Sequence, residues 1–247
     1  MTIGIAFGHA AVALGWLDAA TFLAICLVVT FSIENLGVLT GVPFGHYHFV
    51  VGAGLPHIGS IPAIVGFLYF GMGYPSWVVA GVLLDRAGLQ ADSRFRLIAL
   101  PLVASFVMVQ WDVVMDPSSS TLGGAWIWHD GGGYFGVPLT NYLGWYLTVW
   151  VFFQAFACWQ FSRRNSRLTQ AMDRKSLFWL IPIFLYLGAG LCQVLPLFTA
   201  DDAVIVDPAG QRWRARDLRE TTVIVMAATM LATSVLALLR WFDGLRK

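Results

Sequence analysis

The chain has 247 residues, of which 58% are hydrophobic and only 12% are charged, and its mean hydropathy is +0.71. Soluble domains have about half apolar and about a quarter charged residues, so a water-soluble globular protein is excluded. A net charge of +1 argues against nucleic acid as a partner. The apolar residues occur in long blocks and do not alternate as barrel strands do, which indicates a helical membrane protein.

Six apolar runs are long enough for a spanning helix, which needs about 20 such residues. They are 19–40, 60–84, 96–115, 139–162, 177–199 and 220–242. A shorter run at 3–16 fits a marginal span, a re-entrant piece or an interfacial helix. No repeat and no linker divides the chain. We therefore expect one all-α polytopic membrane domain over residues 1–247, with six to seven and at most eight transmembrane helices joined by irregular loops rich in aromatic residues and glycine.

The basic residues predict the orientation, because cytoplasmic connections carry an excess of Lys and Arg. Eleven of the 15 occur in the connections 85–96 and 163–176 and at the C-terminal end. The connections 41–59 and 116–138 hold none. The connection 200–219 holds the other four, and its Asp207-Pro208-Ala209-Gly210 predicts a hairpin turn. We expect an integral protein of the cell (inner) membrane whose site lies opposite the basic loops, with this hairpin able to cap a cavity.

Most of the chemically reactive residues fall in or beside the two connections that lack basic residues. They are Glu34, His46, His48, His57, Asp112, Asp116, His129 and Asp130. Among the spans, only Glu34 and Asp112 place an acid well inside an apolar run. Ionisable groups there usually face a cavity or a partner. Glycines and aromatic residues surround them, and irregular backbone at membrane depth survives only where it is buried or lines a cavity.

Asp112 and Asp116 are four residues apart and therefore share a helix face. One interpretation is structural: Pro117 ends the helix at Asp116, and Asp112 pairs with an arginine of 212–219. The other is functional: two poorly solvated carboxyl groups favour keeping one of them protonated, and such an acid is a proton donor. Both interpretations remain open from the residues alone.

The histidines raise the question of a metal, because His46 and His48 are two residues apart and carboxylates could complete a site. However, the chain contains no HxxxH or HExxH on a helix, so we expect no metal. Nothing indicates a nucleotide cofactor, since there is no Gly-rich phosphate loop. The GxxxG spacing of Gly37 and Gly41 predicts close helix packing.

Three segments together resemble the membrane-bound carotenoid biosynthesis family: "ENLGVLTGVPFGHYHF", "WDVVMDP" and "WIWHDGGGYFGVPLTNYLGW". The resemblance covers residues 30–160 by motif and the whole chain by its pattern of spans. Known members of the family, of the carotenoid 1,2-hydratase type, hydrate acyclic carotenoid ends. The matching positions are Glu34, Gly37, Gly41, Pro43, Phe44, Gly45, Tyr47, Trp111, Asp112, Asp116, Pro117, Trp126, Trp128, Tyr134, Gly136, Pro138, Asn141, Gly144 and Trp145.

The resemblance implies a cofactor-independent hydratase, a hydro-lyase that protonates a terminal alkene to a tertiary carbocation, which water then captures. We expect Asp112 or Asp116 to donate the proton, with Glu34 as a second candidate donor or as the base that orients water. Substrate contacts are expected from an aromatic set and one amide: Trp111, Phe44, Tyr47, Trp126, Trp128, Tyr134, Asn141 and Trp145. The expected partners are an acyclic carotenoid, water and the lipid bilayer. Association with other carotenoid enzymes is a further expectation that stays open.

Three alternatives remain open. A carotenoid cyclase would use the same protonation but exclude water. A carotenoid- or quinone-binding membrane protein, or a small transporter, would do no chemistry, although no internal symmetry of the transporter kind is visible. A metal-dependent membrane oxidase or desaturase would use the five histidines, but the chain lacks the several histidine motifs of that class.

Overall fold

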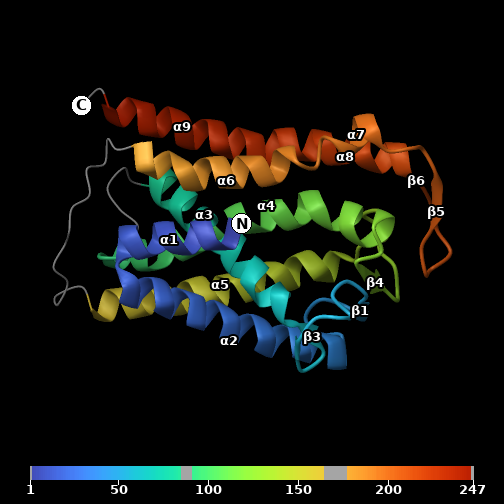
Figure 1. Ribbon diagram of the computed structural model, residues 1–247, viewed down its shortest axis with the longest axis horizontal. Coiled ribbons are helices and arrows are strands. Elements are labelled where there is room, and N and C mark those ends of the chain that lie inside the picture. Colours follow the sequence, from blue (N-terminus) through green and yellow to red (C-terminus); the bar gives the residue numbers. More distant parts are fainter. Residues whose placement is uncertain (1, 85–90, 164–176, 246–247) are drawn as a thin grey trace.

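The computed structural model describes residues 2–84, 91–163 and 177–245 and is a bundle of long helices with short hairpins at one end (Figure 1). The helices are α1 Thr2–Leu14, α2 Trp16–Thr40, α3 Ala63–Leu84, α4 Arg94–Asp116, α5 Leu139–Ser162, α6 Leu180–Leu191, α7 Pro196–Thr199, α8 Ala215–Met226 and α9 Ala232–Leu245. Two π-helical segments, η1 Pro117–Leu122 and η4 Ala227–Leu231, follow α4 and α8. A 3₁₀ turn, η3 Leu177–Trp179, precedes α6.

Five helical segments are long and apolar enough to cross a membrane. They are Trp16–Thr40, Ala63–Leu84, Arg94–Leu122, Leu177–Thr199 and Ala215–Gly244. These confirm the expected all-α polytopic membrane protein and five of the six expected spans. The sixth expected span forms as α5 but is not among these segments, because Tyr, Trp, Asn and Gln dilute its apolar residues.

The short N-terminal run forms α1, whose 13 residues reach about 20 Å at 1.5 Å per residue, less than the thickness of a hydrocarbon core. α1 packs against α2 and α3 with Ala6, Ala10 and Ala11 buried. It therefore covers part of the bundle and does not cross a membrane by itself.

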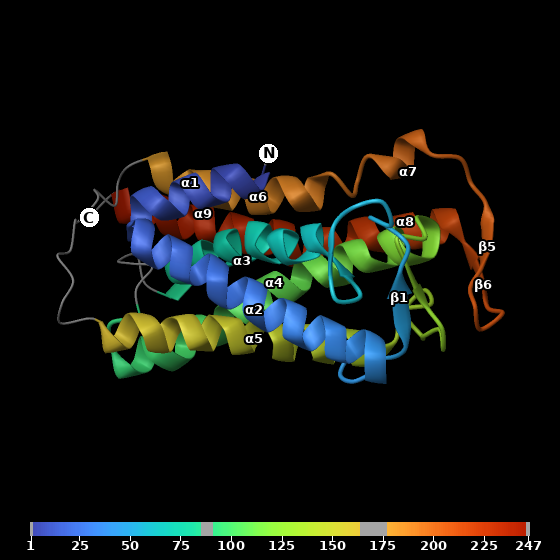
Figure 2. The ribbon, with the colours of Figure 1, turned by 60° about the horizontal axis from the view of Figure 1, so that its bottom comes forward.

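α3 and α4 form the middle of the bundle. α2 and α5 pack on one side of them, and α6, α8 and α9 pack on the other (Figures 1 and 2). α3 is the most enclosed of the membrane-length helices, with 72% of its apolar window buried, and it contributes Tyr69, Tyr74 and Trp77 to the core. The core is thus built on aromatic side chains.

Three two-stranded antiparallel hairpin-like sheets gather at one end of the bundle in both views. β1 (Tyr47–Phe49) pairs with β4 (Trp126–Trp128), β2 (His57–Ile58) with β3 (Ile61–Pro62), and β5 (Val204–Val206) with β6 (Arg212–Arg214). The β1–β4 pair joins the two connections that lack basic residues, with Tyr47 opposite Trp128 and Phe49 opposite Trp126. This pairing brings distant segments of the sequence to one place.

The expected hairpin at 200–219 is present. The backbone N–H of Gly210 donates to the carbonyl of Asp207 at 2.9 Å, and Gly210 has a φ of 83°, which only glycine adopts freely. The four arginines face five acidic residues in the segment 200–220. Arg214 lies 2.8 Å from Asp202, and this hydrogen bond lowers the pKa of Asp202. Two of the four arginines of this loop, Arg214 and Arg216, are therefore paired with acids of the same segment.

The described basic residues outside the 200–219 segment lie at the end of the bundle opposite the sheets, and the predicted side of the membrane stays a prediction. α4 begins, and α5 and α9 end, at the end opposite the hairpins, so Arg94 and Arg163 lie there (Figure 1). Most of the other basic residues of that side fall at 85–90, 164–176 and 246–247, outside the described residues. The expected GxxxG contact is only half right: Gly37 packs against the Phe44 ring, but Gly41 has a φ of 77° and ends α2.

Candidate active site

The two aspartates of α4 share one face, as their spacing predicts, and this face packs against α5. Asp112 and Asp116 are 0% and 1% exposed. Asn141, in the first turn of α5, donates from its Nδ2 to Asp116 Oδ2 at 2.6 Å and to Asp112 Oδ2 at 3.1 Å. One amide therefore holds both carboxyl groups, a positioning contact that differs from the substrate contact expected of Asn141.

Asp116 has hydrogen-bond donors on both carboxyl oxygens. Besides Asn141, the indole N–H of Trp126 donates to Oδ1 at 2.8 Å. α4 ends at Asp116, as expected from Pro117, but the chain continues as the wide helical turn η1, where Ser120 Oγ donates to the Asp116 carbonyl at 2.8 Å. These two hydrogen bonds favour the ionised form of Asp116, whereas its burial opposes it.

Asp112 differs from Asp116 in one respect. Its Oδ1 is buried and has no hydrogen-bond partner in the described part of the chain. Buried polar atoms without partners are rare and mark places where water, an ion or a reacting group belongs. A proton on this oxygen would have no protein acceptor and would be available to a bound molecule.

Glu34, on α2, is held differently again. The phenol of Tyr69 on α3 donates to its Oε1 at 2.5 Å, and the phenol of Tyr47 on β1 donates to its Oε2. Burial and the neighbouring Glu34 raise the pKa of Tyr47 above its usual range, so this phenol remains a donor. Glu34 therefore connects α2, α3 and β1.

No positive charge balances the three acids. Among the described residues, no Lys, Arg or His forms an ion pair with Asp112, Asp116 or Glu34. The arginine partner considered for Asp112 is therefore absent from the described chain, and Arg214 and Arg216 of the 200–219 hairpin pair with acids of their own segment. Uncompensated acids at this depth are costly, and such residues are commonly functional.

Aromatic rings surround the acids. Trp145 stacks on Tyr69 at 4.3 Å and meets Trp111 edge-on at 5.9 Å. Tyr47 packs against Trp128 at 4.9 Å between ring centroids. Tyr134 lies near the pair, since burial and the charge of Asp116 raise the pKa of its phenol. The expected aromatic residues are thus brought to one end of the bundle.

Phe44 belongs to the same region but fills a packing position. Its ring is 1% exposed and lies between two glycines. A Cβ on Gly37 of α2 or on Gly144 of α5 would fall 2.6 Å from that ring. Phe44 therefore sets the close approach of the loop after α2 to both helices.

Three polar side chains of this region were not singled out from the sequence: Tyr69, Ser120 and Tyr142. Tyr69 lies in an apolar run, where a tyrosine is easily taken for an ordinary core residue. A buried tyrosine hydroxyl usually has a hydrogen-bond partner, so its presence in such a run could have indicated a nearby polar group. The Tyr142 hydroxyl is buried and forms no hydrogen bond of ordinary geometry among the described residues, and the same holds for the indole N–H of Trp128. With Asp112 Oδ1, three polar atoms without such a bond belong to the residues around the acid pair.

The histidines lie outside this cluster. His48 Nδ1 is 2.9 Å from His129 Nε2, and His46 Nδ1 is 2.8 Å from Asp130 Oδ2, all with exposed side chains. His57 contacts the carbonyl of Leu55. Within residues 2–84, 91–163 and 177–245, no three His, Cys, Asp or Glu side chains are grouped as metal ligands.

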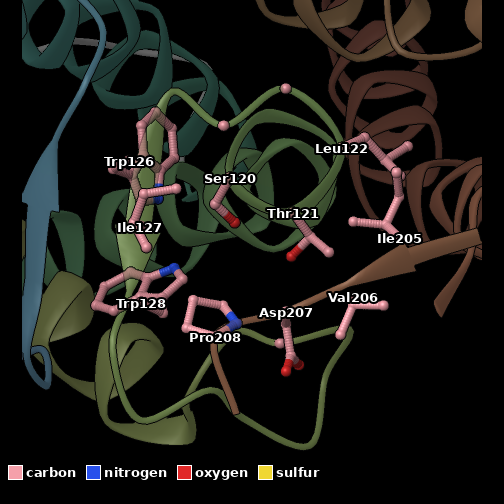
Figure 3. Close-up of a pocket in the computed structure, with 13 residues that line it drawn as sticks. Ser120, Thr121, Leu122, Trp126, Ile127, Trp128, Ile205, Val206, Asp207 and Pro208 are labelled. Carbon is pink, nitrogen blue, oxygen red and sulfur yellow. The ribbon is translucent and has the colours of Figure 1, made fainter. Parts of the chain in front are cut away.

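A pocket of about 410 Å³ lies beside the acids, between η1, β4 and the β5–β6 hairpin (Figure 3). Its lining includes Ser120, Thr121, Trp126, Trp128 and Pro208. Trp126 thus lines the pocket and also donates its N–H to Asp116. The expectation that the 200–219 hairpin caps a cavity agrees with this geometry.

The fold and the site together define the protein as a helical membrane bundle with buried acids and aromatic rings at one end. The chain belongs to the family of carotenoid biosynthesis proteins, whose sequence model matches residues 1–200. This confirms the resemblance seen in the motifs.

A particular relative is the bisanhydrobacterioruberin hydratase of Haloarcula japonica. The chain is 29% identical to it over 119 residues, which are 48% of this chain and 38% of that protein. The matched stretch therefore spans well under two thirds of the hydratase. No solved structure matches the chain.

Proposed function

We propose that the protein is a hydratase that adds water to the terminal double bond of an acyclic carotenoid end. The observation that carries the proposal is the asymmetry of the acid pair: Asp112 keeps one buried oxygen unpartnered, while both oxygens of Asp116 accept hydrogen bonds. This arrangement supports one carboxylic acid and one carboxylate side by side. Membership of the carotenoid biosynthesis family and similarity to a named hydratase support the substrate class.

In this mechanism Asp112 donates its proton from Oδ1 to the less substituted carbon of the terminal alkene. The positive charge then lies on the tertiary carbon, next to the carboxylate of Asp116. Water attacks that carbon and forms the tertiary alcohol, and the proton that the water releases returns to a carboxylate of the pair. The reaction changes no net oxidation state, so an acid and a water molecule suffice for its atom balance.

The surrounding residues have supporting roles in the proposal. Asn141 donates to both carboxyl groups and holds them next to each other, and the Trp126 N–H stabilises negative charge on Asp116. Aromatic faces stabilise a desolvated cation by about 2 kcal/mol, and Trp111 and Tyr134 are placed to contribute. Glu34, with a phenol on each oxygen, anchors β1 to α2 and α3 and thereby positions the aromatic wall.

The experiment is expression of the full chain in a host that accumulates lycopene, with pigment masses read by chromatography and mass spectrometry. We expect a product that has gained one or two molecules of water. A new pigment of unchanged mass would contradict hydration and favour a cyclase. Unchanged pigment with lycopene and also with other acyclic carotenes would contradict an enzyme of this kind.

A further inference from the structure

The side chains that line the inner side of the pocket also contact Asp116. Trp126 and Trp128 are alternate residues of β4 and both line the pocket. Trp126 donates to Asp116, and Ser120, also in the lining, donates to the Asp116 carbonyl. A single layer of side chains therefore lies between the pocket and the carboxyl groups.

That layer contains a donor shared between the pocket and the acids. Trp128 is 5% exposed, and its indole N–H interacts with the Asp116 carboxyl group but forms no hydrogen bond of ordinary geometry in the described part of the chain. Figure 3 shows the nitrogen edge of the Trp128 ring turned toward the space that Ser120, Thr121 and Pro208 border. A buried N–H that is incompletely satisfied by protein atoms is commonly completed by ordered water, which here could bridge Trp128 and Asp116.

The size and position of the pocket suit water. Its 410 Å³ far exceeds the roughly 10–15 Å³ that one water molecule requires. It lies at the hairpin end of the bundle, where the last residues of the membrane-length segment Arg94–Leu122 line it together with β4 and the hairpin. A carotenoid dissolved in lipid approaches through the sides of the bundle, so water and substrate need separate routes.

The outer side of the pocket is formed by the hairpin residues Ile205, Val206, Asp207 and Pro208. Asp207 does not offer its carboxylate to the pocket, because the Gln211 N–H and the Trp213 indole N–H donate to it at 2.9 and 2.7 Å. Trp213 also packs on Phe135 at 5.4 Å, which fixes the hairpin to the loop before α5. This side of the pocket lies beyond residue 200, where the family match ends.

We propose that this pocket holds and delivers the water that captures the carbocation, with the Trp128 N–H as its inner hydrogen-bond donor. The inference rests on the proposed function. The water oxygen forms the new C–O bond, and one of its protons goes to a carboxylate of the acid pair. Asp112 and the pocket thus perform separable steps: protonation of the alkene and capture of the cation.

The separation of these steps gives the test. When protonation proceeds but water cannot reach the cation, the cation loses a proton and returns to the alkene. In D₂O this return places deuterium on the recovered alkene without adding water. Trp128→Phe, which removes the indole N–H but keeps an aromatic ring, and Ile127→Phe, which fills the pocket, should both show this behaviour.

The experiment uses the purified full chain in detergent with lycopene in D₂O, and mass spectrometry of both product and recovered substrate. Hydration should fall about tenfold or more in both variants, equivalent to about 1.4 kcal/mol, while deuterium still enters the recovered lycopene. Ile98→Phe is the matched control, because it makes the same change at a 64% exposed position near the start of α4.

The inference is overturned when both pocket variants hydrate as fast as the Ile98→Phe control. It is also overturned when hydration and deuterium uptake fall together, because the pocket residues would then support the acids and not the water. Failure of the proposed function looks different: the unmodified protein itself would neither hydrate lycopene nor exchange deuterium into it.

Discussion

Asp112 and Asp116 lie on one helix face, yet their hydrogen-bond surroundings differ. Trp126 and Asn141 satisfy Asp116, whereas Asp112 Oδ1 has no described partner. A carboxyl group that must give up a proton needs an oxygen that the protein does not occupy. The proposed mechanism therefore takes Asp112 rather than Asp116 as the donor, a choice that the sequence left open.

The first prediction concerns this donor. Asp112→Asn keeps the size of the side chain but removes the acid, so hydration should fall at least about 100-fold, the range that general acids contribute. Deuterium exchange into the alkene should fall with it. Asp130→Asn, at an exposed position at the same end of the bundle, should change neither. Hydration at the unmodified rate in Asp112→Asn would show that another group donates the proton.

The second prediction concerns Glu34. Tyr69→Phe leaves Glu34 Oε1 buried without its donor, which should lower the free energy of unfolding by about 1–3 kcal/mol. Tyr146→Phe is the matched control, because the Tyr146 hydroxyl has no described partner to lose. Thermal unfolding in detergent measures both. Equal stability of the two variants would mean that the phenol–carboxylate contact contributes nothing to folding.

At the residue scale, the sequence identified the acids but not how they are held. The spacing of Asp112 and Asp116 was enough to place them on one face. It could not reveal that Asn141 contacts both, because that contact depends on how α5 packs on α4. Tyr69 was missed because its sequence neighbours are those of an ordinary buried helix.

At the scale of elements, α2, α5 and the loop between α2 and β1 meet on one phenylalanine ring. Gly37 and Gly144 leave the space that Phe44 fills, and the chain turns back at Gly41. The Phe44 ring, which we call the wedge, thereby fixes how closely the loop after α2 approaches α2 and α5. Its fit is the structural reason for glycine at positions 37 and 144.

The third prediction tests the wedge. A Cβ at Gly144 would lie 2.6 Å from the Phe44 ring and 3.1 Å from the backbone of Pro43, so Gly144→Ala should destabilise the protein by about 1–3 kcal/mol. Gly188→Ala on α6 meets no atom within 4 Å and should raise helix stability by up to about 1 kcal/mol. Thermal unfolding of both variants provides the comparison, and a harmless Gly144→Ala would refute the close packing.

Elements were predicted well where local chemistry decides them. The turn residues Asp207 to Gly210 gave the hairpin, and Pro117 gave the end of α4. The helical continuation through η1 was not foreseen, since serines and a proline are typical of loops. It forms because Ser120 Oγ bonds back to Asp116 and because η1 packs against α4 and α8.

At the scale of the whole molecule, the two ends of the bundle differ in kind. One end carries the sheets, the pocket and the acids, and the other carries helix ends that lead into the basic connections. Six spans were expected, and five of them are among the described segments apolar enough to cross a membrane. The order of the helices followed from the apolar runs. Which side chains meet across the bundle did not, because helix packing is a long-range property.

The fourth prediction concerns orientation. In a bacterial host, and in a background without the three native cysteines, Gln211→Cys on the hairpin should react with a membrane-impermeant thiol reagent added to intact cells. Asp92→Cys, before α4, should react only after the cells are broken. Both positions are exposed, so access alone decides the result. The opposite pattern would place the site on the cytoplasmic side.

The central claim is that water itself, activated by nothing more than an acid pair, becomes the hydroxyl group of a carotenoid end. The most direct measurement incubates the purified protein with lycopene in oxygen-labelled water and reads the mass of the alcohol formed. The account predicts a tertiary alcohol whose oxygen carries the label of the water. An alcohol whose oxygen comes from dissolved O₂ would contradict it and point to an oxidase.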